Sequence, residues 1–110
     1  MDKNTRDAQL RGSLLNHARL KYSRDPQGWV SGSLLMLAAR DEERMPVIGE
    51  EHATELLADL VELQLLDEQQ AADRGIGKRT LEHRRYRITA KGREYCWGSI
   101  PAIPGVEISL

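Results

Sequence analysis

Six basic side chains lie close together in the sequence, around the glycines of Gly75-Ile76-Gly77: Arg74, Lys78, Arg79, Arg84, Arg85 and Arg87. Lysine and arginine neutralise phosphates and release counterions, which makes affinity for nucleic acid depend on salt. Arginine at the tip of a loop can also enter a narrow, A·T-rich minor groove. The cluster therefore predicts contact with double-stranded DNA. The alternative is pairing with acidic residues of the same chain or of a second copy.

The net charge of −1 conceals four blocks of opposite sign. Residues 1–40 carry net +4, residues 41–73 carry −10, residues 74–93 carry +7 and residues 94–110 carry −2. Such blocks bear on the partners of a protein rather than on its fold. Residues 74–93 are expected to favour phosphate, and residues 41–73 are expected to repel it.

A helix expected over residues 50–63 weakens the DNA prediction. Helices that enter the major groove usually offer Arg, Lys, Asn or Gln to the base edges. The polar face of this helix carries four carboxylates instead: Glu51, Glu55, Asp59 and Glu62. Only His52 and Thr54, near its start, suit DNA contact. Either the helix docks by its first turn, or the basic hairpin leads, or the partner is a basic protein.

Catalytic and metal-binding chemistry find little support in the sequence. His17, His52 and His83 are isolated from one another and have no partner at metal-ligand spacing, so we expect no metal site. Cys96 is interpreted as a small core filler rather than a nucleophile. We expect no enzyme activity and no cofactor.

The same residue, Cys96, is the only cysteine and allows no internal disulfide, which fits a reducing cytoplasm. No apolar run approaches the ~20 residues that span a bilayer, so no membrane contact is expected. The 110 residues are 40% hydrophobic and 30% charged, which fits one folded domain, and leucine must fill a core that has no Phe.

The elements that must position these side chains follow from local patterns. Asn4 or Thr5 is a candidate N-cap for a first helix that runs to about Tyr22. Asp25-Pro26-Gln27-Gly28 ends it, and Trp29-Val30 forms a short edge strand or caps the core. A second helix, Leu34–Arg40, has a continuous apolar run before Arg40 and is expected to be largely buried.

In the third helix, the apolar stripe comprises Ala53, Leu56, Leu57, Leu60 and Val61. A strand follows over residues 83–89. Its alternation directs Tyr86 and Ile88 to one face and Arg85 and Arg87 to the other. Thr89 is expected to cap a short last helix that ends near Trp97.

Residues 98–110 are expected to form an extended arm, because Pro101 and Pro104 forbid a helix. The chain therefore divides into a domain at 1–97 and an arm at 98–110. The arm and its approach are rich in apolar side chains, among them Trp97, Ile100, Ile103, Val106 and Ile108. We expect them to clasp a second copy in a homodimer. The alternatives are an arm folded on its own first helix and a disordered tail.

The order helix, strand, glycine loop and basic strand resembles a winged helix. More narrowly, the chain is similar to the small winged-helix, ArsR-like proteins of Mu-like prophages. That similarity rests on Ser33-Leu34-Leu35, the block from Leu56 to Leu66, Ile88-Thr89-Ala90-Lys91-Gly92 and Ile103-Pro104-Gly105-Val106. The long basic wing departs from this group.

The resemblance implies an α+β winged-helix fold with three helices, a two- or three-stranded hairpin wing, a short C-terminal helix and an arm. It also implies DNA binding, and we expect a phage-related transcriptional regulator that acts by occupying a site. The rival hypothesis is a non-enzymatic protein-interaction module on the same scaffold, in a phage or host assembly.

Overall fold

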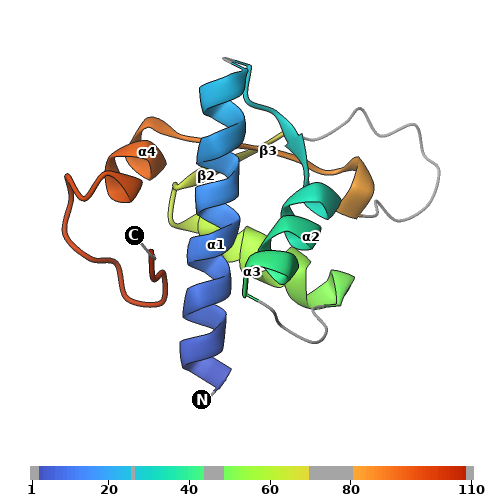
Figure 1. Cartoon of the computed structure of the whole chain (residues 1–110), viewed down its shortest axis with the longest axis horizontal. Helices are drawn as coiled ribbons and strands as arrows, with labels where there is room; N and C mark the ends of the chain where they lie inside the picture. The colour runs from blue at the N-terminus through green and yellow to red at the C-terminus, as the bar shows by residue number, and fades with distance from the viewer. Residues whose placement is uncertain (1–2, 26, 44–48, 70–80, 109–110) are drawn as a thin grey trace.

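The computed structural model describes residues 3–25, 27–43, 49–69 and 81–108. Over these ranges the chain is α+β, with four α-helices, one 3-10 helix and a small antiparallel sheet of three strands (Figure 1). The elements are, in order, α1 (Lys3–Arg24), β1 (Val30–Ser31), α2 (Gly32–Glu43), α3 (Glu50–Glu62), β2 (Leu66–Gln69), η1 (Leu81–His83), β3 (Arg85–Ile88) and α4 (Ala90–Cys96).

Strand β3 is the centre of the sheet, whose strand order is β1-β3-β2. Val30 of β1 and Leu66 of β2 lie opposite Tyr86 and Ile88 of β3, respectively. These four side chains are all buried, which places them on the face of the sheet that meets the helices. Of the two alternatives for Trp29-Val30, the short edge strand is found, over Val30–Ser31, and the alternation of β3 is confirmed.

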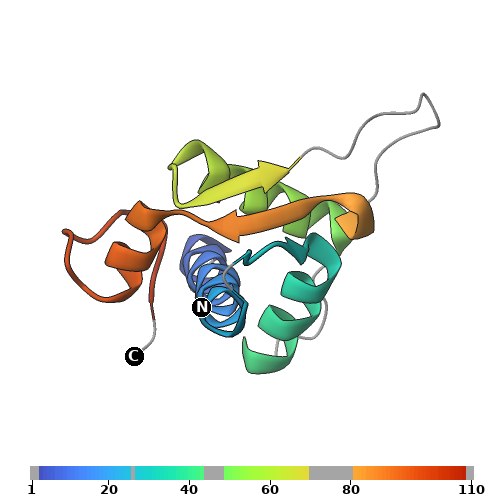
Figure 2. The same ribbon diagram turned by 90° about the horizontal axis from the view of Figure 1, so that it is seen from above.

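Helix α1 lies under the sheet, between α2 on one side and α4 on the other (Figure 2). Its apolar face is fully buried: Leu10, Leu14, Leu15 and Ala18 are each at most 2% exposed. Because these side chains recur every three to four residues, they form one continuous stripe along the helix. The stripe forms the middle of a core in which leucine is the most frequent residue.

Two other local predictions are confirmed. Ala53, Leu56, Leu57 and Leu60 of α3 are buried, whereas Val61 is only partly so. The Thr89 side chain accepts a hydrogen bond from the backbone N–H of Gly92, so that it caps α4.

Two other predictions are corrected. The final strand was expected to begin at His83, but residues 81–83 form η1 instead, with Leu81 buried at its start. Helix α2 was expected to be largely buried, yet Leu34 is 61% and Leu37 is 39% exposed. Only the side of α2 that carries Leu35 and Ala39 faces the core, and nothing in the described residues covers the opposite side.

None of the helices in the described ranges has both the length and the apolar character needed to cross a bilayer.

The core assignment makes a direct prediction about stability. Leu56→Ala and Leu60→Ala should each lower the free energy of unfolding by ~2–5 kcal/mol, because each removes buried methyl groups and leaves a cavity. Urea denaturation measures the loss. Trp97→Ala is the control, since Trp97 is 66% exposed and its truncation should have a much smaller effect. Unchanged midpoints for both leucine variants would mean that the buried face of α3 has been misplaced.

Candidate nucleic-acid interface

The solvent-facing side of β3 presents two arginines. Arg85 is exposed and Arg87 is partly exposed, while Tyr86 between them points into the core. Across the sheet, Gln69 lies opposite Arg85 and Asp67 lies opposite Arg87, both on β2. The predicted basic face therefore exists on this strand, with one carboxylate beside it.

Arg87 stacks on Trp29, the residue that precedes β1. The guanidinium carbon lies 4.5 Å from the centroid of the indole ring. Nη1 also donates a hydrogen bond of 3.4 Å to the carbonyl oxygen of Gln27. Stacking on an aromatic ring holds the guanidinium in place and leaves N–H groups at its edge for an anion.

A second stacked pair lies next to the first. The guanidinium carbon of Arg93, on α4, is 4.3 Å from the ring centroid of Tyr22 on α1. Gly28, at φ +65°, separates the two pairs. A Cβ at Gly28 would lie 2.9 Å from Cδ2 of Tyr22 and 3.1 Å from Cγ of Arg87. The bare glycine therefore lets both side chains approach, and the four form what we call the arginine–aromatic row: Arg93, Tyr22, Arg87 and Trp29.

Of this row, only Arg87 was predicted as a site residue, and Trp29 was assigned to an edge strand or a core cap. Arg93 was not singled out, and Tyr22 was noted only for the apolar face of the first helix. Both stacked pairs join residues from distant parts of the chain, so no local sequence spacing predicts them. The one available signal was Gly28, a glycine between a helix end and an aromatic residue.

Arg84 is partly buried and is paired within its own chain. Its Nη1 lies 3.1 Å from Oε1 of Glu68, which is itself opposite Tyr86 in the sheet. Burial, and to a lesser extent the Glu68 carboxylate, raises the pKa of Tyr86 to about 12, despite an opposing effect of Arg84. Of the arginines predicted to contact DNA, Arg84 is therefore committed to an ion pair in its own chain.

Arg74, Lys78 and Arg79, together with Gly75 and Gly77, lie outside the described residues.

The start of α3 is engaged within the chain. Nε2 of His52 lies 2.9 Å from Oδ1 of Asp7 on α1, and Oγ1 of Thr54 donates to the carbonyl oxygen of Glu50 at 2.8 Å. These were the only two side chains of the helix expected to suit DNA. The exposed positions of α3 include Glu51, Glu55 and Glu62. A phosphate approaching this helix would therefore meet carboxylates first.

A hollow of about 350 Å³ lies between α1 and α3. Its polar lining is mostly acidic and comprises Asp7, Arg11, Glu51, His52, Glu55 and Asp59. Arg11 spans the two helices, since its Nη2 lies 2.9 Å from Oδ2 of Asp59. One cation thus faces several carboxylates, which leaves the hollow acidic on balance.

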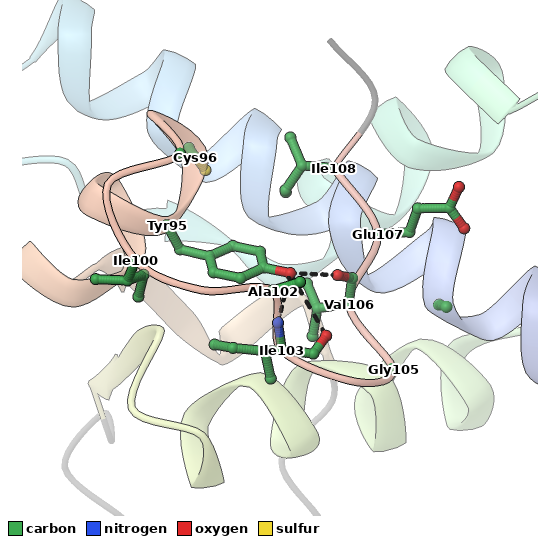
Figure 3. A pocket seen from close by; sticks show the side chains of 11 residues that line it. Tyr95, Cys96, Ile100, Ala102, Ile103, Gly105, Val106, Glu107 and Ile108 are labelled. Atoms are coloured by element: carbon green, nitrogen blue, oxygen red, sulfur yellow. Dashed lines mark hydrogen bonds between the residues drawn. The ribbon is translucent and has the colours of Figure 1, made fainter.

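The arm folds back on its own first helix (Figure 3). The Tyr95 hydroxyl donates to the carbonyl oxygen of Val106 at 2.5 Å and accepts from the N–H of Ile103 at 3.1 Å. The N–H of Glu107 donates to the carbonyl oxygen of Ala8 on α1 at 3.0 Å. Val106 is 4% exposed. In this structure the arm therefore packs on the first helix of its own chain, which was one of the two alternatives to the clasping arm.

The remaining arm positions vary in exposure. Ile100, Ile103 and Ile108 are partly buried against the core, and Trp97 is 66% exposed. Between the arm and α4 lies an open apolar hollow of about 480 Å³, lined in part by Cys96. Burial raises the pKa of the Cys96 thiol, which disfavours the thiolate and fits the prediction of a core filler.

Among the described residues, no group of His, Cys, Asp and Glu side chains is arranged to hold a metal ion.

The hydrogen bonds of Tyr95 predict how firmly the arm is held. Tyr95→Phe should cost about 1–3 kcal/mol, because it leaves a buried carbonyl and a partly buried N–H without their partner. Urea denaturation measures the cost, and hydrogen exchange at the Ile103 amide should become faster. Tyr22→Phe is the matched control, since no hydrogen bond of the Tyr22 hydroxyl is found among the described residues. Equal stability of the two variants would contradict this account of the arm.

The raised pKa of Tyr86 predicts sensitivity to alkali. The folded chain holds this proton more tightly than the unfolded chain, whose tyrosine titrates near 10.0. The contribution is therefore complete below pH 10 and is lost as the pH rises toward 12. Across that interval the wild type should lose roughly 2–3 kcal/mol more than Tyr86→Phe. Urea midpoints on both sides of pH 10 test this, and parallel curves for the two proteins would contradict it.

Comparison of the chain with protein-family models, with curated proteins and with solved structures finds no match. The assignment of a function therefore depends on the geometry described above.

Proposed function

We propose that this chain is a winged-helix protein that binds duplex DNA through its sugar-phosphate backbone and regulates by occupying a site. The order of α1, β1, α2, α3, β2 and β3 supports the winged-helix part. So does the antiparallel pairing of β2 with β3, because the residues that join these strands are those a winged helix uses as its wing. The regulatory part depends on the sequence motifs that resemble those of small prophage winged-helix proteins.

The observation that carries the DNA proposal is the line of arginines along β3 and into α4. Arg85 and Arg87 share the solvent-facing side of the strand, and Arg93 continues the line beyond it. Aromatic rings hold the last two in place, so binding a phosphate costs them little additional conformational entropy. The connection before η1 adds Arg74, Lys78 and Arg79 in sequence.

In this proposal the strand and the wing make the phosphate contacts, and α3 does not lead. The exposed carboxylates of α3 would repel the backbone, and Asp67 opposes Arg87 directly in the sheet. Phosphate contacts position a protein on DNA and do not read sequence. We therefore expect binding that is weak, tolerant of sequence and dependent on salt.

A second candidate function is supported by the acidic hollow between α1 and α3. Its carboxylates come from two rigid helices, and Glu51 and Glu55 are exposed at its rim. A basic segment of another protein would find complementary charge there. This candidate makes the chain an interaction module on the same scaffold, and it predicts the opposite response to charge removal.

Fluorescence anisotropy with a labelled random duplex, across a salt series, tests the proposal. Arg85→Ala and Arg93→Ala should each weaken binding to all sequences and lower the salt slope by about one unit, because each removes one phosphate contact. The paired change Lys78→Ala with Arg79→Ala should do the same for the wing. Arg6→Ala is the control. It removes an equal charge from an exposed site in the first turns of α1, at the other end of that helix.

A wild-type protein that shows no duplex binding even at low salt would overturn the DNA proposal. The interaction module would then stand, and Glu51→Gln with Glu55→Gln should abolish capture of a basic peptide such as polylysine. If DNA binding is seen, these two changes should instead strengthen it, because they remove carboxylates that repel the phosphates.

A further inference from the structure

An apolar surface spans α1 and α2 on the side away from the arm. Three of the four exposed large apolar side chains among the described residues lie on these two helices, namely Leu20, Leu34 and Leu37, which are 37%, 61% and 39% exposed. A hollow of about 400 Å³ lies beside them, and Leu20, Val30, Leu34 and Ala38 contribute to its lining. Exposed apolar side chains that gather on one face often mark a contact with another molecule.

The spacing on α2 makes this surface a straight stripe. Leu34, Leu37 and Asp41 are three and four residues apart, so they project from one face of the helix. The stripe runs roughly 10 Å along the helix, at ~1.5 Å per residue. Asp41, at its far end, is exposed.

The two ends of the surface carry opposite charge. Helix α1 ends beside β1, where α2 begins (Figure 1). Arg24 and Lys21, from the last turn of α1, therefore lie with Leu34 around the hollow. Arg24 is exposed, whereas Lys21 lies 4.0 Å from Asp25. Asp41 lies in the last turns of α2, at the other end. The surface thus has a basic end, an apolar middle and an acidic end.

From this arrangement we propose that a second copy of the chain docks on this surface, with the two α2 helices antiparallel about a two-fold axis near Leu37. An isologous contact brings the same patch of both subunits together. With the axis at the middle of the stripe, the Leu34 end of each copy faces the Asp41 end of the other. Arg24 of one copy then lies beside Asp41 of its partner, twice, around a leucine centre.

Charge complementarity favours a second copy over another occupant. A uniformly acidic partner would satisfy Arg24 but would be repelled at Asp41, and a uniformly basic one would meet the reverse problem. The chain itself supplies the required order of basic, apolar and acidic groups. The predicted homodimer is retained in this way, with its contact moved from the arm to α1 and α2. The proposal does not depend on DNA binding.

Sedimentation velocity on the full chain tests the proposal. The wild type should sediment at twice the mass of one chain at tens of micromolar. Leu34→Gln and Leu37→Gln should each raise the dissociation constant at least tenfold. Trp97→Gln removes the fourth exposed apolar side chain, which lies outside this surface, and should leave the dissociation constant unchanged. A wild type that is monomeric at several hundred micromolar overturns the proposal, and so does a dimer that withstands both leucine changes.

A charge exchange tests the antiparallel arrangement and does not depend on the leucine variants being folded. Arg24→Glu alone and Asp41→Arg alone should each weaken the dimer at low salt, because each places like charges together across the interface. The double variant restores opposite charges at both ends and should recover at least most of the wild-type affinity. If the double variant is as weak as the sum of the single changes, the antiparallel pairing is wrong. Circular dichroism confirms that each variant is folded.

Discussion

The packing of one helix, α1, constrains the rest of the molecule. Helices α2, α3 and α4 and strand β3 all pack against it, so the position of each depends on the same leucine stripe. The arm reaches α1 at Gly12, where a Cβ would lie 1.6 Å from the carbonyl oxygen of Glu107. A glycine inside a helix costs roughly 0.5–1 kcal/mol relative to alanine. Because Gly12 has no side chain, the arm can lie directly on the backbone of α1 and cover part of the core.

Patterns with a local period were predictable from the sequence, because the period itself specifies which side chains face the core. The stripe of α3, the alternation of β3 and the Thr89 cap all belong to this class. Burial on α2 was not predictable in the same way. A helix that is apolar on every side gives no indication of which side meets the core, and Leu34 was therefore placed wrongly. Leu81 was missed because one leucine among polar residues has no period.

Contacts between distant residues explain what the sequence left open in the candidate site. The contact of Trp29 with Arg87 depends on the pairing of β1 with β3. The contact of Tyr22 with Arg93 depends on the packing of α4 on α1. The choice between a clasping and a self-packed arm likewise depended on the hydroxyl of Tyr95 and the missing side chain of Gly12. Neither residue carries a local signal for that choice. Composition identified the arm as a surface-covering segment but could not say which surface it covers.

Electrostatics within the chain reduces the number of charges left for a partner. Within residues 74–93, Arg84 is paired with Glu68, so the nominal +7 of this segment overstates what is available for DNA. Outside it, Arg11 is paired with Asp59, and His52 lies beside Asp7. The remaining arginines on β3 and α4 are few, but two are held by aromatic rings. Each phosphate contact contributes a separate increment to the salt dependence of binding. With only a few arginines in contact, the loss of one should change that dependence by a measurable fraction. The two proposals fit together, because a symmetric dimer would present two copies of the proposed DNA-binding face to one duplex.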